Sequence, residues 1–518
     1  MIALIITICF VFAATFTVYS QTAKPVKEKK PVKVSLLGNY YEQDGDHSAV
    51  NGGLGSQELF SNALETMIHI PIKDSSAIKV GGGFDYFTSA SMLKIDKYQS
   101  SASSGTSNVS GDELRSFGSI GFDLAHKRSR SIFSPTIGFS QEYDVRSFNG
   151  GLSWAKSLRR RHATYIVGGN LIADRWMMVY PGEFRASTAE YYSGASTLTG
   201  ASPVYGGGTS GGTSGGTSGG STSGGTSGGS GSGSGNGSGG NSDGGIWTGN
   251  QNDAFDYVTK SGSENSSGST SGSHYETGTQ YPNATVIPVT GKTISKDGKT
   301  YPMDWRYSLA LTNQYSFVIN KRSNMAVGAD LVYQNGMLST PFHRVYFNDG
   351  IADEFYKEVR IEKLPRTRFK VAAFARYNLS VNKYLTVRTF ARYYTDNWGV
   401  QGITTQVETP IRITSALSIV PSYRFYYQLK SKYFAGYGEH SYRQESYYTS
   451  DYDLSGFISN KVGGAVRYAP VKSIFNLRNK TSLKSVFAMR SAGVRYAYYH
   501  RSDGLKSQSV TVELTFEL

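Results

Sequence analysis

Arginine is the residue type whose placement in this sequence most clearly suggests a function. Several stretches alternate between apolar and polar side chains, and arginines stand at the polar positions. Alternate side chains of a β-strand point to the same face, so these guanidinium groups would share one surface. Fixed positive charge on such a surface raises the local concentration of anions. The candidate positions are Arg376, Arg388, Arg392, Arg424, Arg467 and Arg495, with Glu408 as the main counter-charge.

A second candidate lies in a long connection between two alternating stretches, at 336–366. This segment and another at 430–453 are rich in Tyr, Phe and charged residues rather than in Gly. Such a composition suits an ordered loop. If the alternating stretches enclose a channel, such a loop could fold over its mouth or turn inward as a constriction. The constriction candidates are Pro341, Phe342, His343, Arg344 and Tyr346.

Catalytic and metal-binding chemistry has little support. The eight histidines do not occur at the spacing of metal ligands, and the glycine-rich repeats lack the pattern of a phosphate-binding loop. The one cysteine, Cys9, lies in the apolar N-terminal segment. If the protein were an enzyme, the best candidate group would be His343 with Asp349, Asp353 and Glu354, which lie in the same long connection. Because scattered polar residues are common in long loops, we expect no enzymatic activity, no catalytic residue, no metal and no cofactor.

The elements that must position these residues show a repeat of two. Between Val371 and Val381 the odd positions are Val, Ala, Ala, Tyr, Leu and Val, whereas the even positions include Arg376 and Asn378. Strands of about ten to fourteen residues are long for a soluble sandwich and fit a tilted strand that crosses a bilayer. About sixteen segments follow the pattern, at 31–41, 59–71, 76–88, 114–126, 132–144, 147–157, 162–174, 304–317, 323–335, 367–380, 384–394, 399–412, 416–429, 454–468, 490–501 and 508–518.

Short and long connections fall on opposite ends when these strands run alternately up and down. The long ones are at 42–58, 89–113, 175–303, 336–366 and 430–453, and one connection, at 469–489, is long on the short-turn end. Outer-membrane barrels have short periplasmic turns and long outer loops. The sequence therefore predicts an all-β fold: a transmembrane antiparallel β-barrel of about 16 strands.

The tract at about 206–245 consists almost entirely of Gly, Ser and Thr. Such a composition has little side-chain surface to bury, so we expect a disordered extracellular loop. The alternative, a tether between two domains, would leave two open sheets with exposed edges.

Residues 1–20 are apolar and uncharged, and small residues precede Gln21. We interpret them as a signal peptide, with residues 21–518 forming a single barrel domain. An uncleaved anchor is the alternative. The composition agrees with a barrel rather than a large soluble core: hydrophobic residues are 38% and aromatic residues 13%, with 37 Tyr.

Five segments resemble a known family: "YQNGMLSTPFHRVYF" (333–347), "RIEKLP" (360–365), "ASPVYGGG" (201–208), "YYTSDYDLS" (447–455) and "RSDGL" (501–505). The chain is similar over most of its length to the Bacteroidota family called domain of unknown function 3570. The resemblance implies an outer-membrane β-barrel without assigned catalytic residues, in company with small lipoproteins and redox-type envelope proteins.

The function that these observations favour is a porin-like channel or transporter component with a basic lumen, in the outer membrane of a Gram-negative, Bacteroidota bacterium. Its expected partners are outer-membrane lipid, small anionic solutes and an envelope lipoprotein or periplasmic protein. The alternatives are a scaffold for an envelope complex and an outer-membrane enzyme. Equally open is that the arginines pair with lumen carboxylates or loop carbonyls and brace the wall. The net charge of +14 would suit nucleic acid, but strands without a basic helix speak against such a partner.

Overall fold

The computed structural model describes residues 31–72, 76–89, 112–158, 162–181, 184, 292–296, 299–348, 358–441, 443, 445–478 and 485–518. The expected signal peptide at 1–20 and the Gly/Ser-rich tract at 206–245 lie outside these described residues. Both therefore stay predictions.

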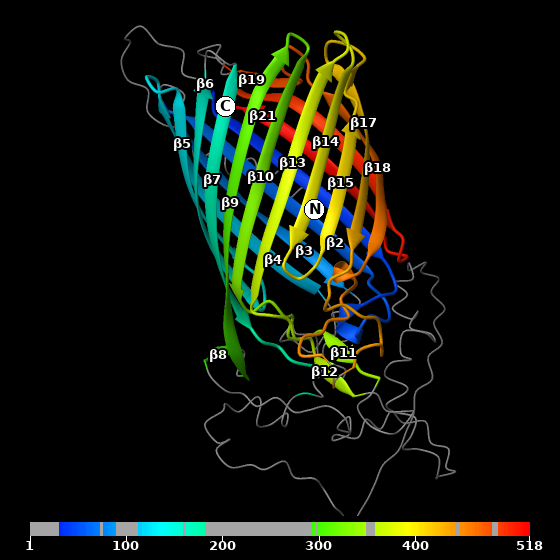
Figure 1. Cartoon of the computed structure of the whole chain (residues 1–518). Helices are drawn as coiled ribbons and strands as arrows, with labels where there is room; N and C mark the ends of the chain where they lie inside the picture. Colours follow the sequence, from blue (N-terminus) through cyan, green and yellow to red (C-terminus); the bar gives the residue numbers. More distant parts are fainter. Residues whose placement is uncertain are drawn as a thin grey trace, which may run out of the picture.

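The chain folds into a closed antiparallel barrel of 16 strands (Figure 1). Closure is made by β1 (Lys33–Asp44), which pairs with β2 (Leu59–Pro71) on one side and β21 (Lys506–Glu517) on the other. The other barrel strands are β3 (Ala77–Ser89), β4 (Asp112–His126), β5 (Ser131–Gln141), β6 (Val145–Leu158), β7 (Ala163–Met177), β9 (Lys299–Asn320), β10 (Ser323–Gly336), β13 (Thr367–Ser380), β14 (Thr386–Asp396), β15 (Gln401–Glu408), β17 (Leu417–Leu429), β18 (Phe457–Tyr468) and β20 (Ser485–Arg501). The predicted fold class and strand number are confirmed.

Three shorter strands extend barrel strands. Beyond Pro410, which lacks an N–H for the ladder, β16 (Ile411–Arg412) pairs with β17 as β15 does. Likewise β19 (Phe475–Arg478) pairs with β20 beyond the point where β18 ends, and β8 (Thr293–Lys296) pairs with β9. The connection expected at 469–489 is therefore partly a β-hairpin, because β19 and the first residues of β20 pair there.

Large apolar side chains cover the outer face. Leu114, Ile137 and Leu171 are 59%, 63% and 54% exposed, and they alternate with polar residues along β4, β5 and β7. A protein in water rarely leaves apolar surface of this extent uncovered, so this face meets lipid. None of the described helices is long and apolar enough to span a bilayer.

The connections divide between a short-turn end and a long-loop end, as the sequence predicted. In Figure 1 the long-loop end is at the bottom, where β8, β11 (Arg344–Tyr346) and β12 (Val359–Ile361) lie. The strands β11 and β12 form a separate two-stranded sheet. Two 3-10 helices, η1 (Ala49–Asn51) and η7 (Tyr452–Leu454), belong to the connections β1–β2 and β17–β18.

Candidate functional site

The barrel interior is identified by an ion pair that spans part of the wall. Arg495 Nη1 on β20 lies 3.6 Å from Glu408 Oε1 on β15, although β17 and β18 run between these strands. Neighbouring strands are about 4.8 Å apart, so the two side chains meet only on the concave face of a curved sheet. The adjacent Val494 is 51% exposed on the opposite, outer face.

The six predicted arginines stand at interior positions on strands β13 to β20 but differ in their partners. Arg392 Nη2 lies 3.5 Å from Asp330 Oδ2 of β10. The guanidinium of Arg376 lies 5.3 Å from the ring centre of Phe374 and 5.4 Å from that of Phe390. Among the described residues, no carboxylate forms an ion pair with the remaining three, which are Arg388, Arg424 and Arg467.

The sequence interpretation left out interior lysines, and Lys461 is one of them. Lys461 on β18 is the register partner of Arg424 on β17. It too makes no ion pair within the described part of the chain. Like charges directly opposite each other on neighbouring strands are unfavourable. The rule that identified the arginines would have found Lys461 if it had been applied to lysine as well.

Acidic residues occupy the interior face on the other side of the barrel. Ser61 Oγ donates a hydrogen bond of 2.5 Å to Asp85 of β3, and Lys79 lies 2.7 Å from Asp123 of β4. On β7, Asp174 forms an ion pair of 2.7 Å with Arg306. The unpaired positive charge is thus concentrated on the wall from β13 to β20.

Loops at the long-loop end pack into a folded cap, which we define by residues 45–58, 178–181, 337–348, 358–366 and 430–456. Its apolar core includes Val50, Tyr180, Tyr346 and Val359, all less than 10% exposed. These residues come from three different connections. Burial of side chains from separate loops in one core holds the loops together.

A hydrogen bond within the cap joins opposite sides of the barrel. Buried Arg344 of β11 donates from Nη1 to the carbonyl oxygen of Val50 in η1 at 2.8 Å. In the closed strand order, eight strands separate the connection β1–β2 from β10–β13 in either direction. The two loops therefore meet across the mouth.

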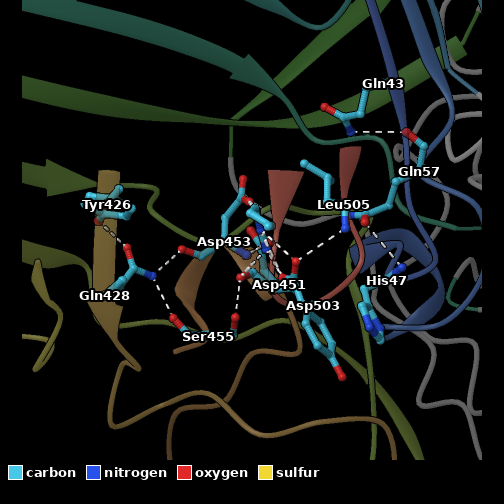
Figure 2. A network of polar contacts seen from close by, with 12 residues as sticks. Gln43, His47, Gln57, Tyr426, Gln428, Asp451, Asp453, Ser455, Asp503 and Leu505 are labelled. Carbon is cyan, nitrogen blue, oxygen red and sulfur yellow. Dashed lines mark hydrogen bonds and ion pairs between the residues drawn. The ribbon is translucent and has the colours of Figure 1, made fainter. Parts of the chain in front are cut away.

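Polar contacts fasten the cap to the rim of the wall, and Figure 2 shows them. Gln428 of β17 donates from Nε2 to the carbonyl oxygens of Asp453 at 2.9 Å and Ser455 at 2.7 Å. On the β1 side, Gln43 Nε2 donates to Gln57 O at 3.1 Å. Arg501 of β20 reaches Asp453 at 2.6 Å.

All five constriction candidates lie in the cap. Arg344, Tyr346 and Pro341 are buried inside it, Phe342 packs against its core, and His343 is partly buried. The structure brings His343 toward Glu362 and Asp451, in an arrangement that the sequence did not predict. Asp349, Asp353 and Glu354, the expected neighbours of His343, lie outside the described residues.

One ring nitrogen of His343 and one carboxylate oxygen each of Glu362 and Asp451 lie within 4.8 Å of one another. Burial, and then the carboxylate of Asp453, raise the pKa of Asp451 to about 6. For His343, burial acts to lower the pKa, but the carboxylate of Glu362 outweighs it and the pKa is raised. These residue types include both nitrogen and oxygen ligands for a metal ion.

A second cluster at the long-loop end is purely acidic and consists of Glu113, Glu142 and Asp144. Burial, and then the carboxylates of Glu113 and Glu142, raise the pKa of Asp144 to about 7. Lys296 approaches the cluster and donates from Nζ to the carbonyl oxygen of Tyr143 at 2.7 Å.

A closed 16-strand antiparallel barrel with an apolar outer face and a polar interior is the outer-membrane β-barrel fold. Residues 255–509 match the family described as "Protein of unknown function (DUF3570)". The match contains four of the five resembling segments and leaves out the one at 201–208. It covers less of the chain than the resemblance implied.

Solved structures with a similar fold include a bacterial polysaccharide outer membrane secretin, at 7% identity and a TM-score of 0.38, with 94% of this chain and 98% of that chain covered. Another is a mutant of the ferric enterobactin receptor PfeA from Pseudomonas aeruginosa, at 8% identity and a TM-score of 0.36, with 91% of this chain and 53% of that chain covered. This chain thus spans about half the length of the receptor. The outer membrane protein OpdK from Pseudomonas aeruginosa is similar at 6% identity and a TM-score of 0.28, with 94% and 98% covered. No curated protein matches the sequence.

Proposed function

We propose that this protein is an outer-membrane conduit for small anionic solutes, closed at its outer mouth by the cap. The observation that carries the proposal is the opposition of Arg424 and Lys461, two neighbouring interior cations without a carboxylate among the described residues. An anion between them would relieve their mutual repulsion. Arg388 on β14 and Arg467 on β18 are further interior cations of this wall without an ion pair among the described residues.

The partial pairing of the arginines supports passage rather than bracing alone. If the arginines served only to stiffen the wall, each would be expected to have a carboxylate or carbonyl partner. Arg495 has such a partner in Glu408, and Arg392 has one in Asp330. The others leave charge available to a solute, and an interior face with fixed charge of one sign selects ions of the opposite sign.

The cap supports a closed resting state that opens. Barrels of 16 to 18 strands generally enclose an aqueous channel, so a loop must cross the mouth to close it. The contact from Arg344 to Val50 crosses it. We place the long-loop end outside and the short-turn end in the periplasm of a Gram-negative bacterium, in the Bacteroidota to which the resemblance points. Conduction in this form requires no catalytic residue.

Ion selectivity in planar lipid bilayers tests the proposal. In a background in which Arg344→Ala loosens the cap, we expect an anion-selective reversal potential under a gradient of KCl. Arg424→Gln combined with Lys461→Gln should shift this potential toward cations while conductance remains. Lys383→Gln, in the turn between β13 and β14, removes a cation outside the lumen and should leave the potential unchanged. Equal shifts in both variants would contradict the proposal.

A second candidate, a scaffold for an envelope complex, is favoured by apolar residues at the short-turn end. Val471, Phe475 and Leu477 are 88%, 51% and 49% exposed in and beside β19. They offer a surface to a periplasmic protein or lipoprotein. A barrel that stays non-conducting after the cap is loosened would favour the scaffold over the conduit.

A further inference from the structure

We propose that His343, Glu362 and Asp451 bind one divalent transition-metal ion of the zinc class and that this ion fastens two loops of the cap together. His343 and Glu362 belong to the connection β10–β13, and Asp451 belongs to the connection β17–β18. The inference concerns the construction of the cap and does not depend on whether the barrel conducts.

The imidazole of His343 is the first reason for this assignment. Its Nδ1 atom has no accessible surface and no hydrogen-bond partner among the described residues. It lies 3.7 Å from Glu362 Oε1, which is too far for a hydrogen bond. A buried polar atom without a partner is unfavourable, and a metal ion would satisfy this nitrogen.

The charge of the cluster is the second reason. With the imidazole neutral, as a metal ligand must be, the two carboxylates give the cluster a net charge of −2 in a partly buried setting. Burial of unpaired charge is costly, and a divalent cation would neutralise it. The cluster at Glu113, Glu142 and Asp144 is acidic but contains no histidine, and Lys296 lies near it, so the same argument does not apply there.

Hydrogen-bond donors already hold the two carboxylates, Glu362 and Asp451, in place as metal ligands. Glu362 is 5% exposed and accepts hydrogen bonds from the backbone N–H of Thr340, at 2.7 Å, and from the hydroxyl of Thr449. Asp451 accepts a hydrogen bond of 2.9 Å from the N–H of Asp453. Such outer partners fix carboxylates in known metal sites and tune their affinity.

The ligand set selects the class of ion. Calcium and magnesium take oxygen ligands, whereas imidazole nitrogen with carboxylate oxygen suits zinc and its neighbours. Around a tetrahedral zinc ion, ligand atoms about 2.1 Å from the metal stand roughly 3.4 Å apart. The distance of 3.7 Å between His343 Nδ1 and Glu362 Oε1 is close to this value. The other distances between ligand atoms are at most 4.8 Å, so these atoms would move closer together around a bound ion. Three protein ligands leave a fourth position for water or a solute.

A cavity borders the cluster on the side of Glu362. Glu362 lines a cavity of about 280 Å³ together with Met178, Tyr180, Met337 and Ile361. An entry path is one requirement of a metal site, besides suitable ligands and an ordered outer shell.

Metal binding to the untagged, refolded barrel tests the inference. After chelator treatment, titration with Zn²⁺ should show one ion per barrel, and Co²⁺ should give the visible absorption bands of a low-symmetry nitrogen and oxygen site. His343→Gln and Asp451→Asn should each weaken Zn²⁺ binding by more than the roughly 10–100-fold expected for loss of an outer partner. Thr449→Val, which removes such a partner of Glu362, should weaken it by roughly 10–100-fold and keep the stoichiometry.

Controls separate this site from other metal binding. His126→Gln removes an exposed histidine at the end of β4 and should leave Zn²⁺ affinity unchanged. A difference in electrophoretic mobility between unheated and heated samples in detergent shows whether each variant has folded. The inference is overturned if the folded wild type binds no stoichiometric Zn²⁺, if it prefers Ca²⁺, or if folded His343→Gln and Asp451→Asn variants bind Zn²⁺ as the wild type does.

Discussion

Arg344 Nη1 donates a hydrogen bond of 2.8 Å to the carbonyl oxygen of Val50, and the loops that carry these residues begin on opposite sides of the barrel. The guanidinium group is 1% exposed. A single side chain thus joins two loops that the wall alone would keep a barrel diameter apart. It acts together with the apolar core, in which Val50 packs with Tyr346 and Val359 of the same two loops.

Loss of this contact should loosen the cap. We expect Arg344→Ala to destabilise the packed loops by about 2 kcal/mol or more, because a hydrogen bond to a buried charged group disappears and Val50 O loses its donor. Limited trypsin digestion should then cleave within 337–366 faster than in the wild type, while the strands stay protected. Lys383→Ala, in the turn between β13 and β14 at the opposite end of the barrel, is the control, and cleavage within 337–366 should not change.

The ion pair between Arg495 and Glu408 offers a test of lumen charge without disruption of the cap. Glu408→Gln frees the guanidinium of Arg495, so anion selectivity of the loosened barrel should increase. The pair is solvated, with Arg495 47% exposed, so the free energy of unfolding should fall by no more than about 1 kcal/mol. A shift of the reversal potential toward cations would contradict this prediction.

Asp144 makes the stability of the long-loop end dependent on pH. Its pKa is about 7 in the folded protein against an ordinary value of 3.8, so the folded state disfavours the carboxylate. Below about pH 4 the residue is protonated in both states and carries no penalty. Stability should decrease as the pH rises from 4 to 7, by on the order of 1–3 kcal/mol, and then level off. Asp144→Asn should flatten this part of the pH profile, measured by urea unfolding in detergent; an unchanged slope would count against the assignment.

Two glycines with positive φ predict different outcomes on substitution by alanine. Gly336, at the start of the connection β10–β13, has a φ of +112°, and an added Cβ would lie 2.0 Å from the carbonyl oxygen of Trp305. Gly504 has a φ of +97°, but a Cβ there meets nothing within 4 Å. We expect Gly504→Ala to cost about 1–3 kcal/mol from backbone strain alone, and Gly336→Ala to be clearly more damaging. Folding yield and urea midpoints measure both; equal effects would show that the contact with Trp305 does not matter.

Much of the barrel follows from local pattern. The period of two places Arg424 and Arg495 on the interior face, because alternation along a strand needs only neighbouring residues. The expected ends of β2 and β13 agree with those in the structure. Strand β9 spans Lys299–Asn320 and is longer than expected. Its extension pairs partly with β8, a segment without a clear alternation of its own.

The cap and its metal-ligating group could not be predicted in the same way. His343, Glu362 and Asp451 come together only because two loops fold onto each other. A search for local ligand spacing does not detect such a group. Lys461, the register partner of Arg424, could have been predicted as an interior cation if lysines had been considered together with arginines.

The conductance of single barrels in planar bilayers tests the central claim most directly. For the wild type we predict few openings, because the cap joins opposite sides of the mouth. For Arg344→Ala we predict frequent openings with an anion-selective reversal potential, carried by the cations on β13 to β20. A wild type that conducts as freely as the variant, or a variant that opens and selects cations, would contradict the account.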